Sequence, residues 1–261
     1  MANKARVLMG TPICDIYEYC LDEYLEALRK QKYPSDILLV DNSEDETFSN
    51  QLKKENGIKV IHVPPESKRR ETVMKCRNLM IEYAIDNNYD FIFYIDADTI
   101  IPKDALEKLM LPNKDVISGV VYNIYQKEGR IMQLPALWTW LTNEEFGQIL
   151  RNKHLYPEIN KKIEKYKVTE SSELRRQFTE KEILEPKIIK IKCCGAACLL
   201  VSRKVFMDTR FNFDKVGNQE CPGEDIGFCN EAVKNGHEIF VNTEVVCKHL
   251  IKNKPKNIFY Q

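Results

Sequence analysis

Apolar residues in the first half of the chain come in short continuous runs, and amphipathic stretches separate these runs. Such runs lie within residues 5–12, 36–43, 58–64 and 89–98. Continuous apolar runs are typical of strands that are buried on both faces, whereas strands with one wet face alternate. Strands that alternate with helices indicate a parallel sheet. We therefore predict an α/β fold with a mainly parallel sheet sandwiched by helices.

The stretches between these runs have helical spacing. One helix is predicted from apolar residues that recur every three or four positions: Tyr17, Cys20, Leu21, Tyr24, Leu25 and Leu28. A second is predicted from about Glu71 to Asn87. Helices on both sides of the strands supply the covering layers that a buried parallel sheet needs.

The second half of the chain is less regular. Strands are predicted at about 117–123 and 188–202, and a loop at 220–223 leads into a helix that ends at Gly236. The pattern shows no internal repeat and no linker. We expect one domain over residues 1–261, with halves of about 1–115 and 116–261 and a helical insertion at about 140–187.

Composition places the chain among ordinary soluble proteins. It is 43% hydrophobic and 30% charged, and 39 basic residues balance 39 acidic ones. A neutral chain argues against a partner held by non-specific charge, such as a long nucleic acid, although a local basic groove stays open.

The cysteines and the N-terminal sequence indicate the cellular compartment of the protein. The nine cysteines are odd in number and form no CxxC pair, which favours free buried thiols in a reducing compartment. The N-terminal apolar run is too short for a signal peptide, and no run reaches membrane-spanning length. We expect a cytoplasmic protein.

Polar residues stand where predicted strands end. Thr11, Asp41 and the pair Asp96 and Asp98 fall at such ends, where open α/β sheets bind ligands. Residues two apart on an extended segment point the same way, so Asp96 and Asp98 could face one small volume. Carboxylates held that close repel each other unless a cation joins them, and oxygen ligands suit Mg²⁺ or Mn²⁺. Alternatively, Asp96 caps a loop and Asp98 caps a helix that starts near Pro102.

Several segments, in order, resemble the landmarks of GT-A glycosyltransferases, closest to the family 2 type. They are TPICDIYEYCLDEYLEAL, ILLVDNSEDE, CRNLMIEYA, FIFYIDADTIIP, GAACLLVSRKVF, PGEDIGFCNEAVKNGHEIFV and CKHL, and they span residue 7 to about 250. The resemblance implies transfer of a sugar from a nucleotide-diphosphate donor, a UDP- or GDP-sugar, to an acceptor, assisted by Mn²⁺ or Mg²⁺. The first half would then bind the nucleotide and the second the acceptor.

The resemblance also implies roles at the nucleotide. Thr11, Pro12 and Asp41 would line its pocket, and Arg70 and Arg77 would reach the base or the diphosphate. Arg69 and Lys68 compete with Arg70 for that role. Each of these assignments has a purely structural alternative. Asp41 would then simply cap the turn that follows it, and the arginine cluster would be a solvated helix end.

Metal and sugar contacts follow from the same resemblance. Asp98 would ligate the metal, Asp96 would meet the ribose or the metal, and His249 would complete the metal shell. Ala97 would contact the nucleotide sugar. Independently of the resemblance, the small residues from Gly195 to Ala197 either let the backbone pass close beneath the donor sugar or simply pack tightly. A lone histidine near a strand end is more often structural, and no matching context exists for the remaining histidines, His62, His154 and His237.

A second pair of acids, Glu224 and Asp225, opens the helix after Pro222 and Gly223. Acids are favoured at helix N-termini by the exposed N–H groups and the dipole. In inverting relatives the aspartate of such a pair is the general base, so the resemblance makes Asp225 the base and Glu224 its support or an acceptor contact. Inversion at the anomeric carbon is expected.

Trp138 and Trp140 are either core residues or functional ones, and in the second case they form a platform for the acceptor or a mobile lid over the donor. The 150–190 region is expected to set the acceptor. That acceptor stays open among a glycan, a lipid-linked sugar, a protein side chain and modified DNA. The neutral charge and the lack of a membrane-spanning run weigh against the lipid and the DNA without excluding them.

Two rival functions remain. A nucleotidyltransferase would have a Gly-rich phosphate loop with a basic residue after the first strand, and GTPICDIYEY has neither. A non-catalytic sugar-nucleotide or partner-binding module would be expected to lose the metal acids or the late acid pair, and the chain retains both.

Overall fold

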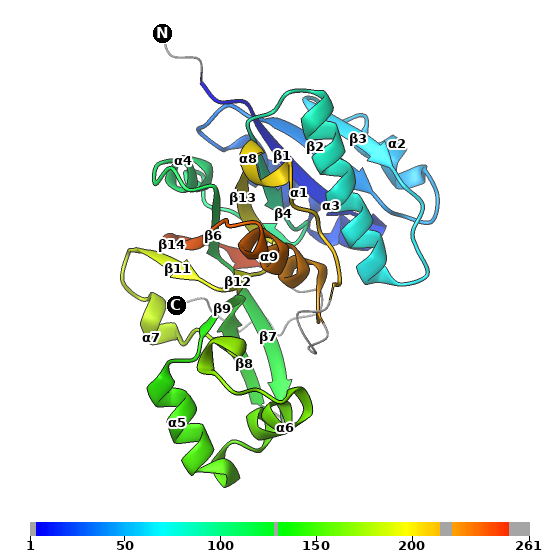
Figure 1. The fold of residues 1–261 in the computed structure, drawn as a ribbon. Helices are drawn as coiled ribbons and strands as arrows, with labels where there is room; N and C mark the ends of the chain where they lie inside the picture. The colour runs from blue at the N-terminus through cyan, green and yellow to red at the C-terminus, as the bar shows by residue number, and fades with distance from the viewer. Residues whose placement is uncertain (1–3, 128–129, 215–220, 251–261) are drawn as a thin grey trace.

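Eight strands form a central sheet in the order β11-β14-β6-β13-β4-β1-β2-β3 (Figure 1). The computed structural model describes residues 4–127, 130–214 and 221–250. The strands of this sheet are β1 (Val7–Ile13), β2 (Asp36–Asp41), β3 (Ile58–His62), β4 (Phe91–Ile95), β6 (Val116–Val120), β11 (Ile188–Ile191), β13 (Cys198–Ser202) and β14 (Ile239–Val246).

Most of the sheet is parallel. Strand β1 pairs in parallel with β2 and β4, β2 with β3, and β14 with β6. Strand β13 runs antiparallel to both of its neighbours, and β11 runs antiparallel to β14. The prediction of a mainly parallel sheet is confirmed, and the carboxyl ends of β1, β2 and β4 meet at one edge.

Helices cover both faces of the sheet, as predicted (Figure 1). Strand β1 shows the division, because Leu8 packs in the cluster that holds Met80 of α3, while Val7 and Met9 pack with Tyr24 of α1. The α-helices are α1 (Leu21–Arg29), α2 (Thr47–Leu52), α3 (Arg69–Asp86), α4 (Ala105–Met110), α5 (Asn143–Arg151), α6 (Pro157–Tyr166), α7 (Glu180–Ile183), α8 (Arg203–Phe206) and α9 (Glu224–Lys234).

The first predicted helix is two elements. A 3-10 helix, η1 (Asp15–Cys20), precedes α1, and Cys20 between them has non-helical dihedrals (φ −127°, ψ 2°). The buried Cys20 thiol donates to the carbonyl of Ala97, 3.4 Å away. This contact ties the segment after β1 to the loop after β4.

A second lobe projects from the sheet. It holds a three-stranded sheet, β10-β9-β12, and a hairpin, β7-β8. Its elements are β7 (Tyr122–Lys127), β8 (Arg130–Pro135), β9 (Leu137–Trp140), β10 (Arg175–Gln177), β12 (Cys193–Cys194) and the 3-10 helices η2 (Lys153–Leu155) and η3 (Ser171–Glu173). Helices α5 and α6 enclose a separate small core that includes Phe146 and Ile149.

The single strand predicted at 188–202 is wrong, because the structure divides it into β11, β12 and β13. Strands β11 and β13 lie in the central sheet, while β12 joins β9 in the second lobe. The chain leaves the sheet around Gly195, whose N–H donates to the carbonyl of Ala136 at 2.9 Å. All three strands are largely apolar, so the hydrophobic pattern does not reveal the breaks.

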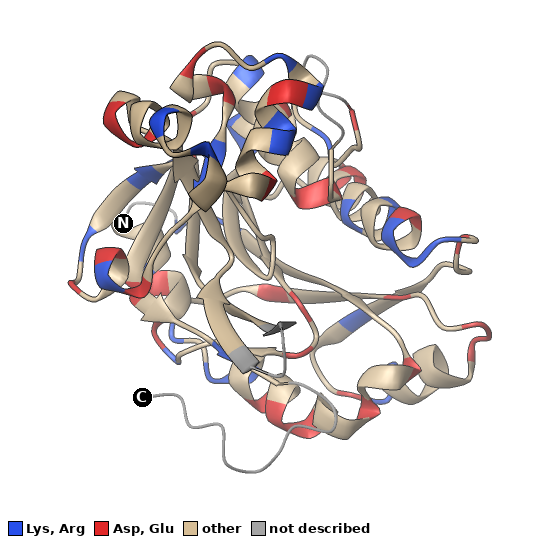
Figure 2. Ribbon diagram, turned by 90° about the horizontal axis from the view of Figure 1, so that it is seen from below, with Lys and Arg blue, Asp and Glu red and all other residues tan. Residues whose placement is uncertain are grey.

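Charged residues of both signs are interspersed over the helices, while the strands carry few (Figure 2). All nine cysteines are free, and seven of them are buried, as predicted. Within the described ranges, no helix is both long and apolar enough to cross a membrane.

Candidate active site

A small cavity of about 130 Å³ opens beyond the carboxyl ends of β1, β2 and β4. Its walls come from the loops after these strands, from α3 and from the first residue of α9. They are Pro12, Cys14, Tyr17, Asn42, Arg69, Val73, Arg77, Asp96, Ala97 and Glu224. Five of the residues predicted from sequence therefore surround one cavity: Pro12, Arg77, Asp96, Ala97 and Glu224.

Arg77 joins the two acidic motifs. Its two terminal nitrogens donate to Asp96 at 2.6 Å and to Glu224 at 2.8 Å. The whole residue is only 3% exposed. Burial opposes its charge, yet the Asp96 and Glu224 carboxylates outweigh burial and raise the pKa of Arg77 above its usual value. A buried arginine held by two carboxylates has little left to offer a diphosphate, so its role is to connect these acids.

The segment beneath Arg77 is built around Phe211. The guanidinium lies 5.4 Å from the Phe211 ring centroid, and Phe211 stacks on Phe228 of α9 at 4.5 Å. Asn78 clamps the Phe211 backbone, accepting from its N–H and donating to its carbonyl, both at 2.9 Å. Helix α9 packs so tightly here that a Cβ at Gly227 would lie 1.9 Å from the Asn212 carbonyl oxygen. This packing fixes the positions of α3 and α9 relative to each other.

The expectation that Asp96 and Asp98 lie on an extended segment is wrong. The chain turns here, and the Thr99 N–H donates to the Asp96 carbonyl at 2.9 Å. The two side chains therefore have different partners: Asp96 contacts Arg77, and Asp98 contacts His249. Both still act on Tyr17, whose pKa is raised first by burial and then by the charge of Asp98, with Asp96 adding to the rise.

Asp98 and His249 face each other, with 3.4 Å between Oδ1 and Nε2. The short strands β5 (Thr99–Ile100) and β15 (Lys248–His249) pair to hold them, and the Leu250 N–H donates to the Asp98 carbonyl at 2.7 Å. The Nδ1–H of His249 donates to the Tyr122 carbonyl at 2.9 Å, which directs Nε2 at Asp98.

This arrangement fits a divalent metal. A ring nitrogen that serves as a ligand usually has its partner nitrogen hydrogen-bonded to a carbonyl, and two acceptors that face each other favour a shared cation. Although burial lowers the pKa of His249, its contact with Asp98 raises it overall. No group of three or more His, Cys, Asp or Glu side chains surrounds a common point in the part of the chain that the structure describes. Asp98 and His249 would supply two ligands, and the rest would come from the bound substrate and water.

Asp225 lies at the N-terminus of α9, next to Gly195. An added Cβ at Gly195 would lie 3.6 Å from Asp225 Oδ2 and 3.4 Å from the Ala136 Cβ. Burial and then the Glu224 charge raise the pKa of Asp225 to about 6, against the opposing effects of Arg77 and the Ile226 N–H. A carboxylate with a pKa near 6 is better matched to proton transfer than an ordinary aspartate.

Thr11 and Asp41 do not line this cavity. Thr11 is fully buried, and its hydroxyl bonds to the Tyr24 hydroxyl. Asp41 is also fully buried: Ser43 donates to one of its oxygens from N–H and hydroxyl, at 3.1 and 2.6 Å, and His62 lies 2.9 Å from the other. Asp41 therefore holds the turn after β2, which is the structural role that the sequence left open as an alternative.

On α3, the cavity uses Arg69, whereas Arg70 points elsewhere. Arg70 is exposed and lies over the Phe213 ring at 5.0 Å. Residues Arg69, Val73 and Arg77 line the cavity at i, i+4 and i+8, and this spacing puts them on one helix face. That periodicity was the signal that could have selected Arg69.

Tyr17, Cys14 and Asn42 were not predicted as cavity residues. Tyr17 has helical spacing with apolar neighbours, which made it look like a core residue, but its hydroxyl accepts from Arg69 at the cavity. Cys14 and Asn42 each follow a strand, and position relative to strand ends was the available signal for both.

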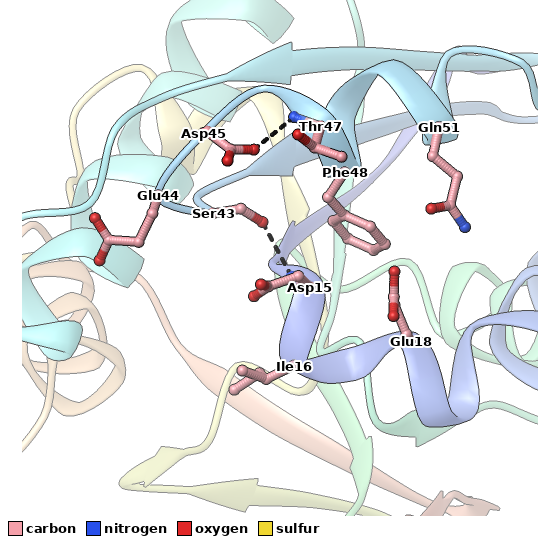
Figure 3. Close-up of a pocket in the computed structure, with 9 residues that line it drawn as sticks. All are labelled: Asp15, Ile16, Glu18, Ser43, Glu44, Asp45, Thr47, Phe48 and Gln51. Carbon is pink, nitrogen blue, oxygen red and sulfur yellow. Dashed lines mark hydrogen bonds between the residues drawn. The ribbon is translucent and has the colours of Figure 1, made fainter.

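A second cavity, of about 500 Å³, lies beside the first, between η1 and the β2–α2 loop (Figure 3). The Asp15 N–H donates to the Ser43 hydroxyl at 3.0 Å across this region. The lining carries four carboxylates and no basic residue: Asp15, Ile16, Glu18, Ser43, Glu44, Asp45, Thr47, Phe48 and Gln51. It would repel a diphosphate.

The sequence was compared with models of known protein families and with curated proteins. A model of the family described as "Glycosyltransferase like family 2" matches residues 15–261. No curated protein matches the sequence significantly.

Two solved structures share the fold at low identity, and a third is less similar. GalNAc-T7 with UDP, GalNAc and Mn²⁺ has a TM-score of 0.61 and 13% identity, over 97% of this chain and 45% of that one. A197 from STIV has a TM-score of 0.51 and 12% identity, over 95% and 87%. S. aureus TarS 1–349 has a TM-score of 0.49 and 15% identity, over 92% and 60%. The chain thus spans less than half of the GalNAc-T7 chain.

Proposed function

The chain belongs to the family 2-like glycosyltransferases, and from this premise we propose that it is a metal-dependent enzyme. In this proposal it moves a sugar from a UDP- or GDP-sugar to an acceptor hydroxyl and inverts the anomeric carbon. The observation that carries the proposal is the Arg77 bridge, which brings Asp96 and Glu224 to one cavity with Asp225 beside them.

Charge decides where the diphosphate lies. The acidic cavity next to η1 would repel it. Arg69 supplies the exposed positive charge at the smaller cavity, and Asp98 and His249 would hold the metal near it. When bound, a divalent metal would neutralise charge on the departing nucleotide diphosphate. The UDP, GalNAc and Mn²⁺ in the GalNAc-T7 structure support a nucleotide sugar and Mn²⁺ for this fold.

Asp225 would act as the general base. Its carboxylate would take the proton of the acceptor hydroxyl as that oxygen attacks the anomeric carbon from the side opposite the diphosphate, which gives inversion. Glu224 is engaged by Arg77 at 2.8 Å. It would therefore hold the start of α9 in place, and contact with the acceptor falls to Asp225.

Thermal shift tests the donor and metal together. UDP, GDP, CMP and their sugars, each with Mn²⁺ or with EDTA, should raise the Tm only for the correct base and only with metal, because ligands stabilise the state that they bind. Asp98→Ala should abolish the metal-dependent part of the shift. The proposal fails if no nucleotide changes the Tm under either condition.

Gly195→Ala should reduce transfer without reducing stability. The new methyl group fits at ordinary contact distance from Ala136 but projects toward Asp225 Oδ2, where an acceptor hydroxyl would approach. We expect kcat/KM to fall by about tenfold or more, since a displacement near 1 Å at a reacting group is costly. The free energy of unfolding should change by about 0.5 kcal/mol or less, so the Tm should stay within about 2 °C of wild type. Unchanged transfer would show that this space is not used.

A further inference from the structure

The small sheet of the second lobe presents one face to the α9 side and the opposite face to α5 and α7. Its middle strand, β9, carries both tryptophans of the chain. Arg175 of β10 lies directly opposite Trp140, and Cys193 of β12 lies opposite Trp138. Directly opposite residues in antiparallel strands point to the same face. Trp138, Trp140, Arg175 and Cys193 therefore share one face.

The opposite face is closed by salt bridges. Arg176 forms ion pairs with Glu145 of α5, 2.8 Å from its Nε, and with Glu182 of α7, also at 2.8 Å. Arg175, by contrast, is half-buried and pairs with no carboxylate in the described ranges 4–127, 130–214 and 221–250. One of two adjacent arginines thus fastens the lobe, and its neighbour offers its charge on the other face.

Arg175 lies in the same neighbourhood as Asp225. Helix α9, which begins with Glu224 and Asp225, packs against β12. The buried thiol of Cys193 has its pKa raised first by burial, and it lies within electrostatic reach of both Arg175 and Asp225. The thiol of Cys221 is subject to the same two charges. Lys192, whose ammonium donates to the Ser172 carbonyl at 3.0 Å, adds a second positive charge near Arg175.

The two tryptophans differ in what they contact. Trp138 packs against the main hydrophobic core, as one of the two sequence alternatives expected. Trp140 is half-buried and belongs to none of the core clusters of described residues. Of the two rings, that of Trp140 is therefore the better candidate for a sugar to stack on.

We propose that Trp140 and Arg175 form the acceptor subsite, and that the acceptor carries an anionic group, a phosphate or a carboxylate, near the hydroxyl that receives the sugar. This inference rests on the proposed function. Trp140 stacks on the apolar face of the acceptor ring, and Arg175 binds the anion through paired N–H donors. Arg175 and Lys192 offset the repulsion that Asp225, Glu224 and Asp96 exert on such an acceptor.

Intrinsic fluorescence tests this directly, because every tryptophan of the chain lies on β9. The protein is titrated with glucose, glucose 6-phosphate and glucuronic acid, with the nucleotide and Mn²⁺ from the thermal-shift screen present. We expect one of the two anionic sugars to change the emission with a Kd at least tenfold below that of glucose. Which of the two binds more tightly identifies the anion as phosphate or carboxylate.

Variants assign the effect to its residues. Arg175→Ala should remove the preference for the anionic sugar, and Trp140→Phe should remove most of the emission change. Arg151→Ala, an exposed arginine on α5 of the same lobe, should retain both. Arg175→Gln, which keeps a polar side chain without the charge, replaces the alanine variant if that variant does not fold.

The inference is overturned if glucose binds as tightly as its anionic derivatives, if the preference survives in Arg175→Ala, or if none of the three sugars changes the emission. The nucleotide shift in Tm, measured on the same samples, separates this failure from failure of the proposed function. If the nucleotide binds but anionic sugars are not preferred, the inference of an anionic acceptor fails and the proposed function stands.

Discussion

Replacing Asp225 with Asn is expected to slow sugar transfer by roughly 10²–10⁴-fold, the usual contribution of a positioned general base. The amide keeps the shape of the side chain but cannot take a proton from the acceptor. The metal-dependent shift in Tm with the nucleotide should persist, because Asp225 lies on the acceptor side. Initial rates with the identified donor measure the change, and full activity in Asp225→Asn would exclude Asp225 as the base.

The pH dependence checks the same role. Because the pKa of Asp225 is raised to about 6, transfer should fall as pH drops through about 6, where the base becomes protonated. The folded-state pKa lies above the unfolded value, so ionisation of Asp225 destabilises the fold as pH rises through that range. Asp225→Asn should thus increase the free energy of unfolding at pH 8, by on the order of 3 kcal/mol at most, and should change it little at pH 4. Thermal unfolding at the two pH values measures the difference.

Arg77→Ala should be the most destabilising single change at the site. It would leave Asp96, Glu224 and Asp225 close together with no buried cation between them. Loss of one partner of a buried ion pair costs about 3–5 kcal/mol, and urea unfolding measures it. Transfer should fall as well, because Glu224 no longer fixes the start of α9.

Arg77→Lys separates charge from geometry. A lysine restores a positive charge but cannot donate in the forked geometry that spans Asp96 and Glu224. We expect it to recover part of the stability and to leave kcat low, with little change in the KM for the donor. Lys75→Ala serves as the control on the same helix, since its pair with Glu66 is exposed and such pairs contribute about 1 kcal/mol or less. Equal stabilities for Arg77→Ala and Lys75→Ala would refute the bridging role.

The sequence was informative where chemistry depends on local order. Residues 89–98 read as a buried strand that ends in acids, and β4 ends at Ile95, directly before Asp96. Residues 222–236 read as a turn and a helix that opens with two acids, and α9 begins at Glu224. Strand ends and helix starts depend on nearby residues, which explains why Asp96 and Asp98 could be selected from the pattern. The roles of Glu224 and Asp225 came from the family resemblance.

The choice of cavity residues on α3 was less successful, because neighbouring arginines have the same chemistry. Arg69 and Arg70 are both basic and exposed, and only the direction of the helix axis decides that Arg69 lines the cavity. The same holds for Arg175 and Arg176, which differ only in the face of β10 on which they lie. One residue of displacement reverses the face in a strand.

By itself, the sequence determined the α/β class, the covered parallel sheet and the acids at the ends of its strands. These follow from hydrophobic spacing and from residue preferences that act over a few positions. The tertiary structure decided which charges meet. Arg77 and Glu224 are 147 residues apart, yet they lie 2.8 Å from each other, and Asp41 proved to be committed to Ser43 and His62. Hydrogen-bond partners depend on how distant elements pack, and no local pattern encodes that packing.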